Sequence, residues 1–263
     1  MIQFNINRFG KLVCWSLTND KRYYVKSFLQ MLVTMLLLFL FFTMITKTHQ
    51  GHSGNYGPCA FAAMLMLVVT PVLGPSFMFY SLTGKHDRQA LMMLPASNFE
   101  KYLMRYSTWI ILFPLYLVAF LAADLFQYFI HWVLGHDYGT FVTSVVMKFM
   151  NEVPQKEVEA ASPHFLVDIL ITGAWLHSMY ALGATFFRSP KFNWVMSTMV
   201  IVLISVLTVW LTKEGSALQS DWKVSKENYV IGIVIYVGWT LLNFWLSYRI
   251  FCRTQVKAKF VNL

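Results

Sequence analysis

The amino-acid sequence predicts an all-α, polytopic membrane protein with six transmembrane helices, both termini in the cytoplasm and an amphipathic helix at the N-terminus. Apolar residues make up 57% of the 263 residues and charged residues only 13%, against about 45–50% and about 25% in soluble chains. Because a water-soluble fold could not cover its surface with so few charges, lipid must be the solvent for much of the chain. We expect residues 1–263 to form a single transmembrane domain.

Six apolar segments are long enough to cross about 30 Å of hydrocarbon as helices, and too long for the strands of a membrane barrel. They are residues 27–46, 58–82, 106–134, 165–187, 192–212 and 228–248. Four of them contain no Asp, Glu, Lys or Arg, whereas the third contains Asp124 and the fourth contains Asp168.

The distribution of basic residues predicts the orientation of these segments. The N-terminal segment, the second and fourth connections and the C-terminal tail together carry 15 of the 21 Lys and Arg residues, and the opposite side carries six. The richer side is expected in the cytoplasm, which places a multi-pass protein in a plasma membrane. The net charge of +9 is explained by this bias, and because no recognition motif accompanies it we expect no nucleic-acid partner.

Two extramembrane segments have helical periodicity. Residues 1–25 place apolar side chains at helical spacing with Arg8 and Lys11 between them, which predicts a short amphipathic helix on the inner leaflet, followed by a break at residues 18–20. The outer loop, residues 135–164, contains an apolar stripe between Phe141 and Met150 that predicts a second helix lying on the surface.

The cytoplasmic connection at residues 82–105 carries the most informative local signal. Pro95 ends one element, and Ser97 and Glu100 then have the S-x-x-E spacing of a capping box, so the third helix is expected to begin at Ser97. The stretch before Pro95 can form a short helix with an exposed apolar cluster, which suits either a docking surface for a partner or a seal against the bilayer. The candidate docking residues are Asp87, Arg88, Leu91, Met92, Met93 and Leu94.

The run LPASNFEKYLMRY at residues 94–106 resembles the LPxSxxEK segment of small permeases that accompany ATP-binding-cassette (ABC) ATPases in Bacteroidetes-type bacteria, which are similar to type-2 ABC exporter permeases. The resemblance implies a homodimer or heterodimer of six-span subunits in the bacterial inner membrane, with a coupling helix between spans two and three that docks on a separate ABC ATPase. This chain has no G-x-x-x-x-G-K-[ST] phosphate loop of its own. The short, polar connection at residues 213–227 departs from the re-entrant half-helices of that class, which weakens the case for a large lipid or polysaccharide substrate.

Polar residues inside the spans offer an alternative function. Asp124, Gln127 and His131 fall at i, i+3 and i+7 on one face of the third span, whereas Asp168 and His177 lie nine residues apart on the fourth, on roughly opposed faces. A charged Asp at mid-bilayer costs about 2.5–3.5 kcal/mol, so it should face protein or water. These residues indicate either an ion-coupled transporter or channel, or hydrogen bonds that hold helices together. A membrane sensor or scaffold that transports nothing is a third reading.

The sequence gives no support for an enzyme. Motifs such as H-E-x-x-H and G-x-S-x-G are absent, so we expect no catalytic residue, no cofactor and no metal site. His49 and His52 have H-x-x-H spacing, but they stand in a Gly-, Ser- and Asn-rich loop that fixes no ligand geometry.

Overall fold

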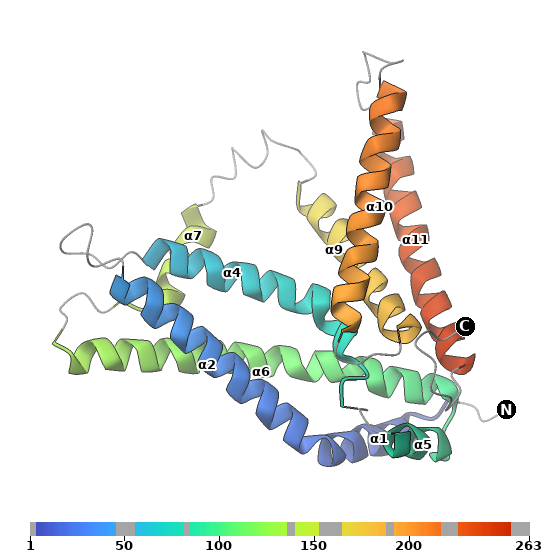
Figure 1. Cartoon of the computed structure of the whole chain (residues 1–263), viewed down its shortest axis with the longest axis horizontal. Coiled ribbons are helices and arrows are strands. Elements are labelled where there is room, and N and C mark those ends of the chain that lie inside the picture. The colour runs from blue at the N-terminus through green and yellow to red at the C-terminus, as the bar shows by residue number, and fades with distance from the viewer. Residues whose placement is uncertain are drawn as a thin grey trace. The chain divides into compact units, whose positions relative to one another are not determined.

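The structure is a computed structural model in which every regular element of the described residues is a helix. It describes residues 4–45, 56–81, 85–135, 140–152, 165–187, 192–216 and 226–253. The helices are α1 (Ile6–Asn19), α2 (Lys21–Ile45), α4 (Tyr56–Leu73), the 3-10 helix η1 (Gly74–Phe77), α5 (Lys85–Met93), α6 (Asn98–Val133), α7 (Val142–Glu152), α9 (Phe165–Phe186), α10 (Asn193–Ser216) and α11 (Lys226–Arg253) (Figure 1).

Among the described residues, six helical segments are long and apolar enough to cross a membrane, which agrees with the predicted number of spans. They are Lys21–Met44, Tyr56–Phe77, Asn98–Val133, Val167–Phe186, Asn193–Trp210 and Tyr229–Arg253. The third has 36 residues and at 1.5 Å per residue is about 54 Å long. Because the hydrocarbon core is only about 30 Å thick, this helix extends beyond it.

The chain forms two compact units, each assembled from segments far apart in the sequence. Unit 1 consists of Met1–Cys14, Val72–Trp109 and Leu166–Leu263, and unit 2 of Trp15–Pro71 and Ile110–Phe165. Unit 1 therefore contains α5, α9, α10, α11 and the first part of α6, and unit 2 contains α2, α7, most of α4 and the rest of α6.

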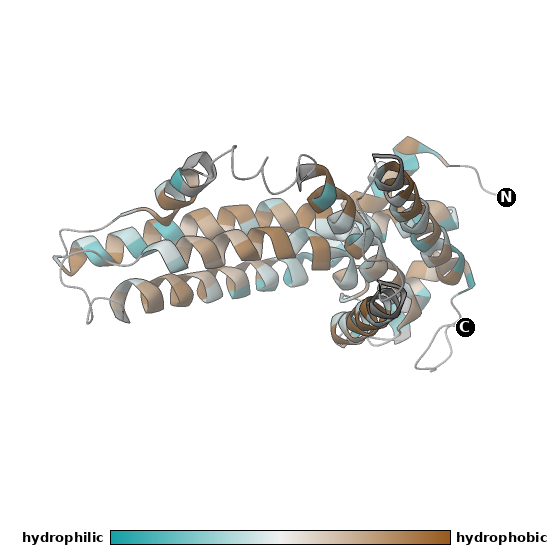
Figure 2. Cartoon of the chain, turned by 90° about the horizontal axis from the view of Figure 1, so that it is seen from above, coloured by the Kyte–Doolittle hydropathy of each residue, from teal (hydrophilic) through white to brown (hydrophobic). Residues whose placement is uncertain are grey.

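The core of unit 2 is built where α2, α4 and the later part of α6 run side by side (Figures 1 and 2). Phe39 of α2 and Phe120 of α6 meet edge to face, with ring centroids 5.8 Å apart. In the same cluster, α4 contributes the small side chains of Cys59, Ala60 and Ala63, all 0% exposed. Small residues at such an interface let helix backbones approach closely, which is how packing is achieved in the absence of a hydrophobic driving force in lipid.

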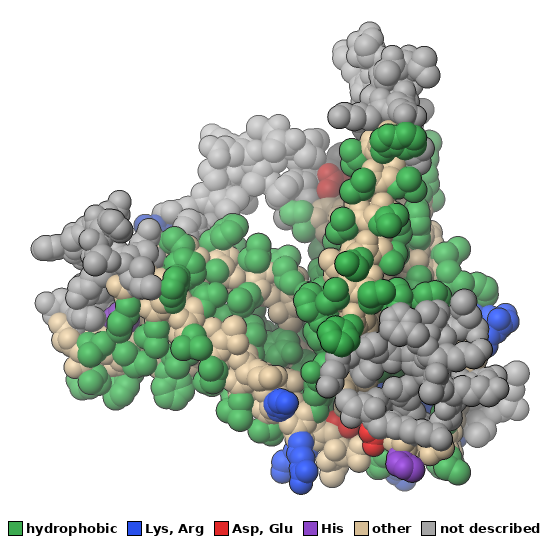
Figure 3. All heavy atoms as spheres, viewed as in Figure 1, with side chains coloured by type: hydrophobic (Ala, Val, Ile, Leu, Met, Phe, Trp, Pro, Cys, Tyr) green, Lys and Arg blue, Asp and Glu red, His purple; other side chains and the backbone are tan. Residues whose placement is uncertain are grey.

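In unit 1, α9 and α10 approach each other through a glycine. A Cβ atom added at Gly183 of α9 would overlap Oγ of Ser197 on α10 and would stand 2.9 Å from Cβ of that serine. On the other side of α10, apolar side chains such as Leu203, Val206 and Trp210 are exposed, and hydrophobic atoms cover the helix in Figure 3. Exposure of this kind fits a surface that faces lipid.

Candidate docking site and intramembrane polar residues

The predicted capping box at the start of α6 is present. The backbone N–H of Glu100 donates to Oγ of Ser97 at 3.2 Å, and the backbone N–H of Ser97 donates to Oε2 of Glu100 at 2.9 Å. Two amide donors at the helix N-terminus are satisfied reciprocally in this arrangement. The helix begins at Asn98, one residue after the predicted start.

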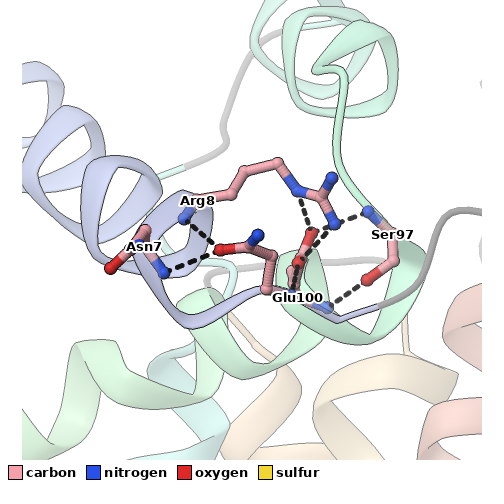
Figure 4. Close-up of polar contacts among 5 residues, drawn as sticks. Asn7, Arg8, Ser97 and Glu100 are labelled. Carbon is pink, nitrogen blue, oxygen red and sulfur yellow. Dashed lines mark hydrogen bonds and ion pairs between the residues drawn. The ribbon is translucent and has the colours of Figure 1, made fainter.

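Glu100 also binds the N-terminal segment of the chain, a role that the sequence analysis missed. The guanidinium of Arg8 donates from Nε to Oε2 at 2.9 Å and from Nη2 to Oε1 at 2.6 Å, and the backbone N–H of Asn5 donates to Oε1 at 2.8 Å (Figure 4). The bidentate pair is charge-assisted, and its hydrogen bond raises the pKa of Arg8 above its ordinary value. With the Ser97 bond included, the Glu100 carboxylate accepts four hydrogen bonds and joins the start of α1 to the start of α6.

The same segment begins α1. Oδ1 of Asn5 accepts hydrogen bonds from the backbone N–H groups of Asn7 at 2.9 Å and of Arg8 at 3.3 Å (Figure 4). An Asn side chain in this position is a common N-cap. The predicted amphipathic helix is therefore present over Ile6–Asn19, and its first turn is fixed both by its own cap and by Glu100.

The short helix predicted in the 82–105 connection is α5, but one of its apolar side chains points inward. Leu91 is 4% exposed and packs in one cluster with Leu12 of α1 and Met104 of α6, and the half-buried Leu94 packs against the same cluster. The expectation that all four apolar side chains are exposed is therefore wrong. Leu91 is buried because α1 covers that side of α5, Met92 and Leu94 are half-buried, and of the four only Met93 is exposed.

The outward stripe of α5 consists of His86, Ala90 and Met93, which follow i, i+4 and i+7 spacing and are all exposed. Met93 is 84% exposed. Asp87 is also exposed and lies beside this stripe. The side chain of Arg88 lies outside the described residues. We call His86, Ala90 and Met93 the α5 stripe.

Two cations of α6 hold the connection that contains α5. Nζ of Lys101 donates to the backbone carbonyl of Met92 at 2.7 Å, which places a positive charge at the C-terminal end of α5, where the helix dipole favours it. Nη1 of Arg105 donates to Oγ of Ser81 at 3.0 Å. Both cations are buried, at 7% and 0% exposure. The buried side of α5 is thus attached to α6 by a hydrogen bond and by apolar packing.

In unit 2, Asp124 caps another helix. Its carboxylate accepts hydrogen bonds from the backbone N–H of Val142 at 2.8 Å, the backbone N–H of Thr143 at 2.9 Å and the Thr143 hydroxyl at 2.5 Å. These groups form the N-terminus of α7, and an anion there is favoured by both the free N–H groups and the helix dipole. Asp124 is 2% exposed, so its carboxylate is committed to holding α7.

Gln127 and His131, on the same face of α6, contact two other helices. Nε2 of Gln127 donates to the hydroxyl of Tyr56 at 3.4 Å, on α4, and Nε2 of His131 lies 2.9 Å from Oγ1 of Thr43, on α2. Both side chains are 0% exposed. The predicted polar face of the third span therefore lies inside unit 2 and binds α7, α4 and α2 in turn.

The polar residues of the fourth span, in unit 1, contact different neighbours. Oδ1 of the half-buried Asp168 accepts a hydrogen bond from the Tyr229 hydroxyl of α11 at 3.0 Å, and Nε2 of His177 lies 2.6 Å from the Tyr106 hydroxyl of α6. The His177 ring also meets the Trp109 ring, with centroids 4.9 Å apart. Asp168 and His177 are thus engaged by two different helices, as their spacing predicts.

His49 and His52, the H-x-x-H pair on the predicted outer side, lie outside the described residues, as does most of the 135–164 loop apart from α7.

Comparison with models of protein families, with curated proteins and with solved structures finds no match for this chain. The class that the fold itself defines is a multi-pass α-helical membrane protein with six candidate spans.

Proposed function

We propose that this chain is the membrane-spanning subunit of an ABC-type exporter in a bacterial inner membrane, and that it acts as a dimer driven by a separate cytoplasmic ATPase. The observation that carries the proposal is α5, a nine-residue helix whose buried side is attached to α1 and α6 while its other side is exposed. Because α5 is attached to α6, a force applied to α5 by a partner is passed on to that span. Residues of the LPxSxxEK-like run make these attachments. Leu94 packs against the cluster of Leu12, Leu91 and Met104, Lys101 binds the end of α5, and Glu100 binds the start of α1.

The chemistry of the α5 stripe supports a protein partner. Met93 is a large, flexible and polarizable side chain that is 84% exposed, and methionine is favoured on surfaces that adapt to a binding groove. The small side chain of Ala90 beside it allows a close approach, and the i, i+4, i+7 spacing matches the way a helix enters a groove on a partner. The partner that we propose is the ATPase, with α5 as the inserted helix.

The proposed mechanism is alternating access. Closure of the ATPase around nucleotide moves α5, and the Lys101 bond to the end of α5 together with the Leu91 contacts carries that movement into α6. Because Glu100 joins α6 to the start of α1, the N-terminal helix moves with them. The chain itself performs no catalysis in this scheme, and the polar side chains of the spans hold the helices together.

An affinity pull-down tests the proposal. We expect the tagged, full-length protein, purified in mild detergent from its own host, to bring with it an ATPase that contains the phosphate-loop motif. Replacing Met93→Asp places a charge in the middle of the α5 stripe and should abolish co-purification of this ATPase. Asn98→Asp is the matched control, since Asn98 is exposed in the first turn of α6, where an acidic residue is favoured, and this variant should retain the ATPase.

Two outcomes would contradict the proposal. One is the absence of any such ATPase from the wild-type preparation. The other is equal recovery with the wild type and with Met93→Asp, which would place the contact elsewhere and leave the α5 stripe as a seal against the bilayer.

A further inference from the structure

The second candidate span is broken near one end, and the break needs partners for its backbone. α4 ends at Leu73 and continues as η1 and a turn that reaches Ser81. Pro71 and Pro75 contribute no N–H group. In a bilayer the groups released by a break must be satisfied by neighbouring helices, side chains or water. The carbonyl of Ser76 accepts a hydrogen bond from Nδ2 of Asn193 on α10 at 2.8 Å.

Three buried oxygen atoms around this break have no hydrogen-bond partner among the described residues. They are Oγ of Ser76, Oγ1 of Thr108 and Oδ1 of Asn193. Each of the three residues is only 1% exposed. Buried polar atoms in native proteins nearly always have a partner, either protein or ordered water. The oxygen atoms at the break therefore need further hydrogen-bond partners.

The contacts of neighbouring residues indicate that the three side chains lie close together. Ser76 and Asn193 are joined by the hydrogen bond already described. Thr108 is three residues after Arg105 and precedes Trp109, on the face of α6 that packs against the break. Arg105 donates to Ser81, and the Trp109 side chain lies 3.1 Å from the position of a Cβ at Gly74. Ser76 stands between Gly74 and Ser81 in the chain, and from the contacts of Arg105 and Trp109 we infer that Thr108 lies near it.

The charged and polar groups of the site indicate what kind of ligand it binds. The buried guanidinium of Arg105, one helical turn from Thr108, opposes a cation. Oδ1 of Asn193 is an acceptor only and disfavours an anion, whereas the buried Nε1–H of Trp109, which also has no hydrogen-bond partner among the described residues, is a donor only. The two hydroxyls make no hydrogen bond to Oδ1 or to each other, so a molecule that both donates and accepts is needed between them. We propose that ordered water occupies this site and bridges Ser76, Thr108 and Asn193. The proposal does not depend on the ATPase.

X-ray radiolytic footprinting of the full-length protein in nanodiscs tests this site, because hydroxyl radicals form on bound water and oxidise the side chains beside it. Met78 is the reporter: it is 0% exposed and lies two residues after Ser76. Met35 is the control, since it is also 0% exposed but lies in the apolar cluster of unit 2. We expect Met78 to be oxidised at a clearly higher rate than Met35. Equal rates for the two methionines would overturn the proposal.

A pair of variants separates bound water from general looseness of the break. Thr108→Ser retains the hydroxyl and should leave the oxidation rate of Met78 unchanged. Ser76→Ala combined with Thr108→Val removes two of the three ligands and should lower that rate to the level of Met35, while the exposed Met93 is oxidised as before. If Met78 is oxidised as fast in the double variant as in the wild type, water does not bind these hydroxyls and the proposal fails.

Discussion

Replacing Asp124→Ala is expected to lower the free energy of unfolding by about 3 kcal/mol and to release α7 from unit 2. The alanine leaves three donors at the N-terminus of α7 without their acceptor, in a place where the carboxylate is only 2% exposed. Because α7 contributes Val142 and Val146 to the core, its release also exposes apolar surface. Thermal unfolding in detergent measures the first effect, and hydrogen exchange of the Val142 and Thr143 amides measures the second.

Asp124→Asn distinguishes this structural role from the ion-coupled alternative. The asparagine keeps one acceptor oxygen and the shape of the side chain, so we expect it to retain most of the stability that the alanine loses and to leave transport intact. An asparagine variant that is as stable as the wild type but does not transport would favour an ion-coupled transporter. An alanine variant with unchanged stability and unchanged exchange of the α7 amides would contradict the capping role itself.

Replacing Gly183→Ala is expected to destabilise unit 1 by about 1–3 kcal/mol, the usual cost of forcing an extra methyl group into a packed interface. The new Cβ would stand 2.9 Å from Cβ of Ser197 and closer still to its Oγ. The hydroxyl can rotate away, but a Cβ atom cannot, so α9 and α10 must separate. The expected result is a lower thermal unfolding temperature of the purified protein.

Two further variants make this prediction specific. Gly173→Ala is the control on the same helix, because nothing lies within 4 Å of a Cβ at that position, and it should not destabilise the protein. Ser197→Gly combined with Gly183→Ala transfers the Cβ from α10 to α9 and should recover most of the lost stability. Additive losses in the double variant would contradict direct contact between these two positions.

The features that were predicted correctly are those determined by residues close together in the sequence. An apolar run of about 20 residues has to cross the bilayer whatever its neighbours are, so the six spans could be found without tertiary information. The capping box at Ser97 and Glu100 is decided within one helical turn. The break between α1 and α2 likewise follows from the polar residues around Asp20.

The missed features depend on contacts between distant segments. Arg8 and Glu100 are 92 residues apart, and nothing in the local pattern distinguishes Arg8 from the other basic residues that mark the cytoplasmic side. Leu91 was expected on an exposed surface because the local sequence of α5 does not show that α1 packs over it. That contact is set by the tertiary fold. For Asp124, the sequence indicated a side chain that faces protein or water. That it binds the N-terminus of α7 depends on the return of the chain after α6.

Site-specific photo-crosslinking at position 93 in living cells tests the proposed docking most directly. A photoreactive amino acid replaces Met93 on the exposed stripe of α5, and the same residue at position 91, which is 4% exposed in the wild type, serves as the buried control. We predict a crosslink from position 93 to an ATPase with the phosphate-loop motif, and none from position 91. Crosslinks from position 93 to lipid alone, or to proteins without that motif, would contradict the assignment of this chain as an ABC-type permease.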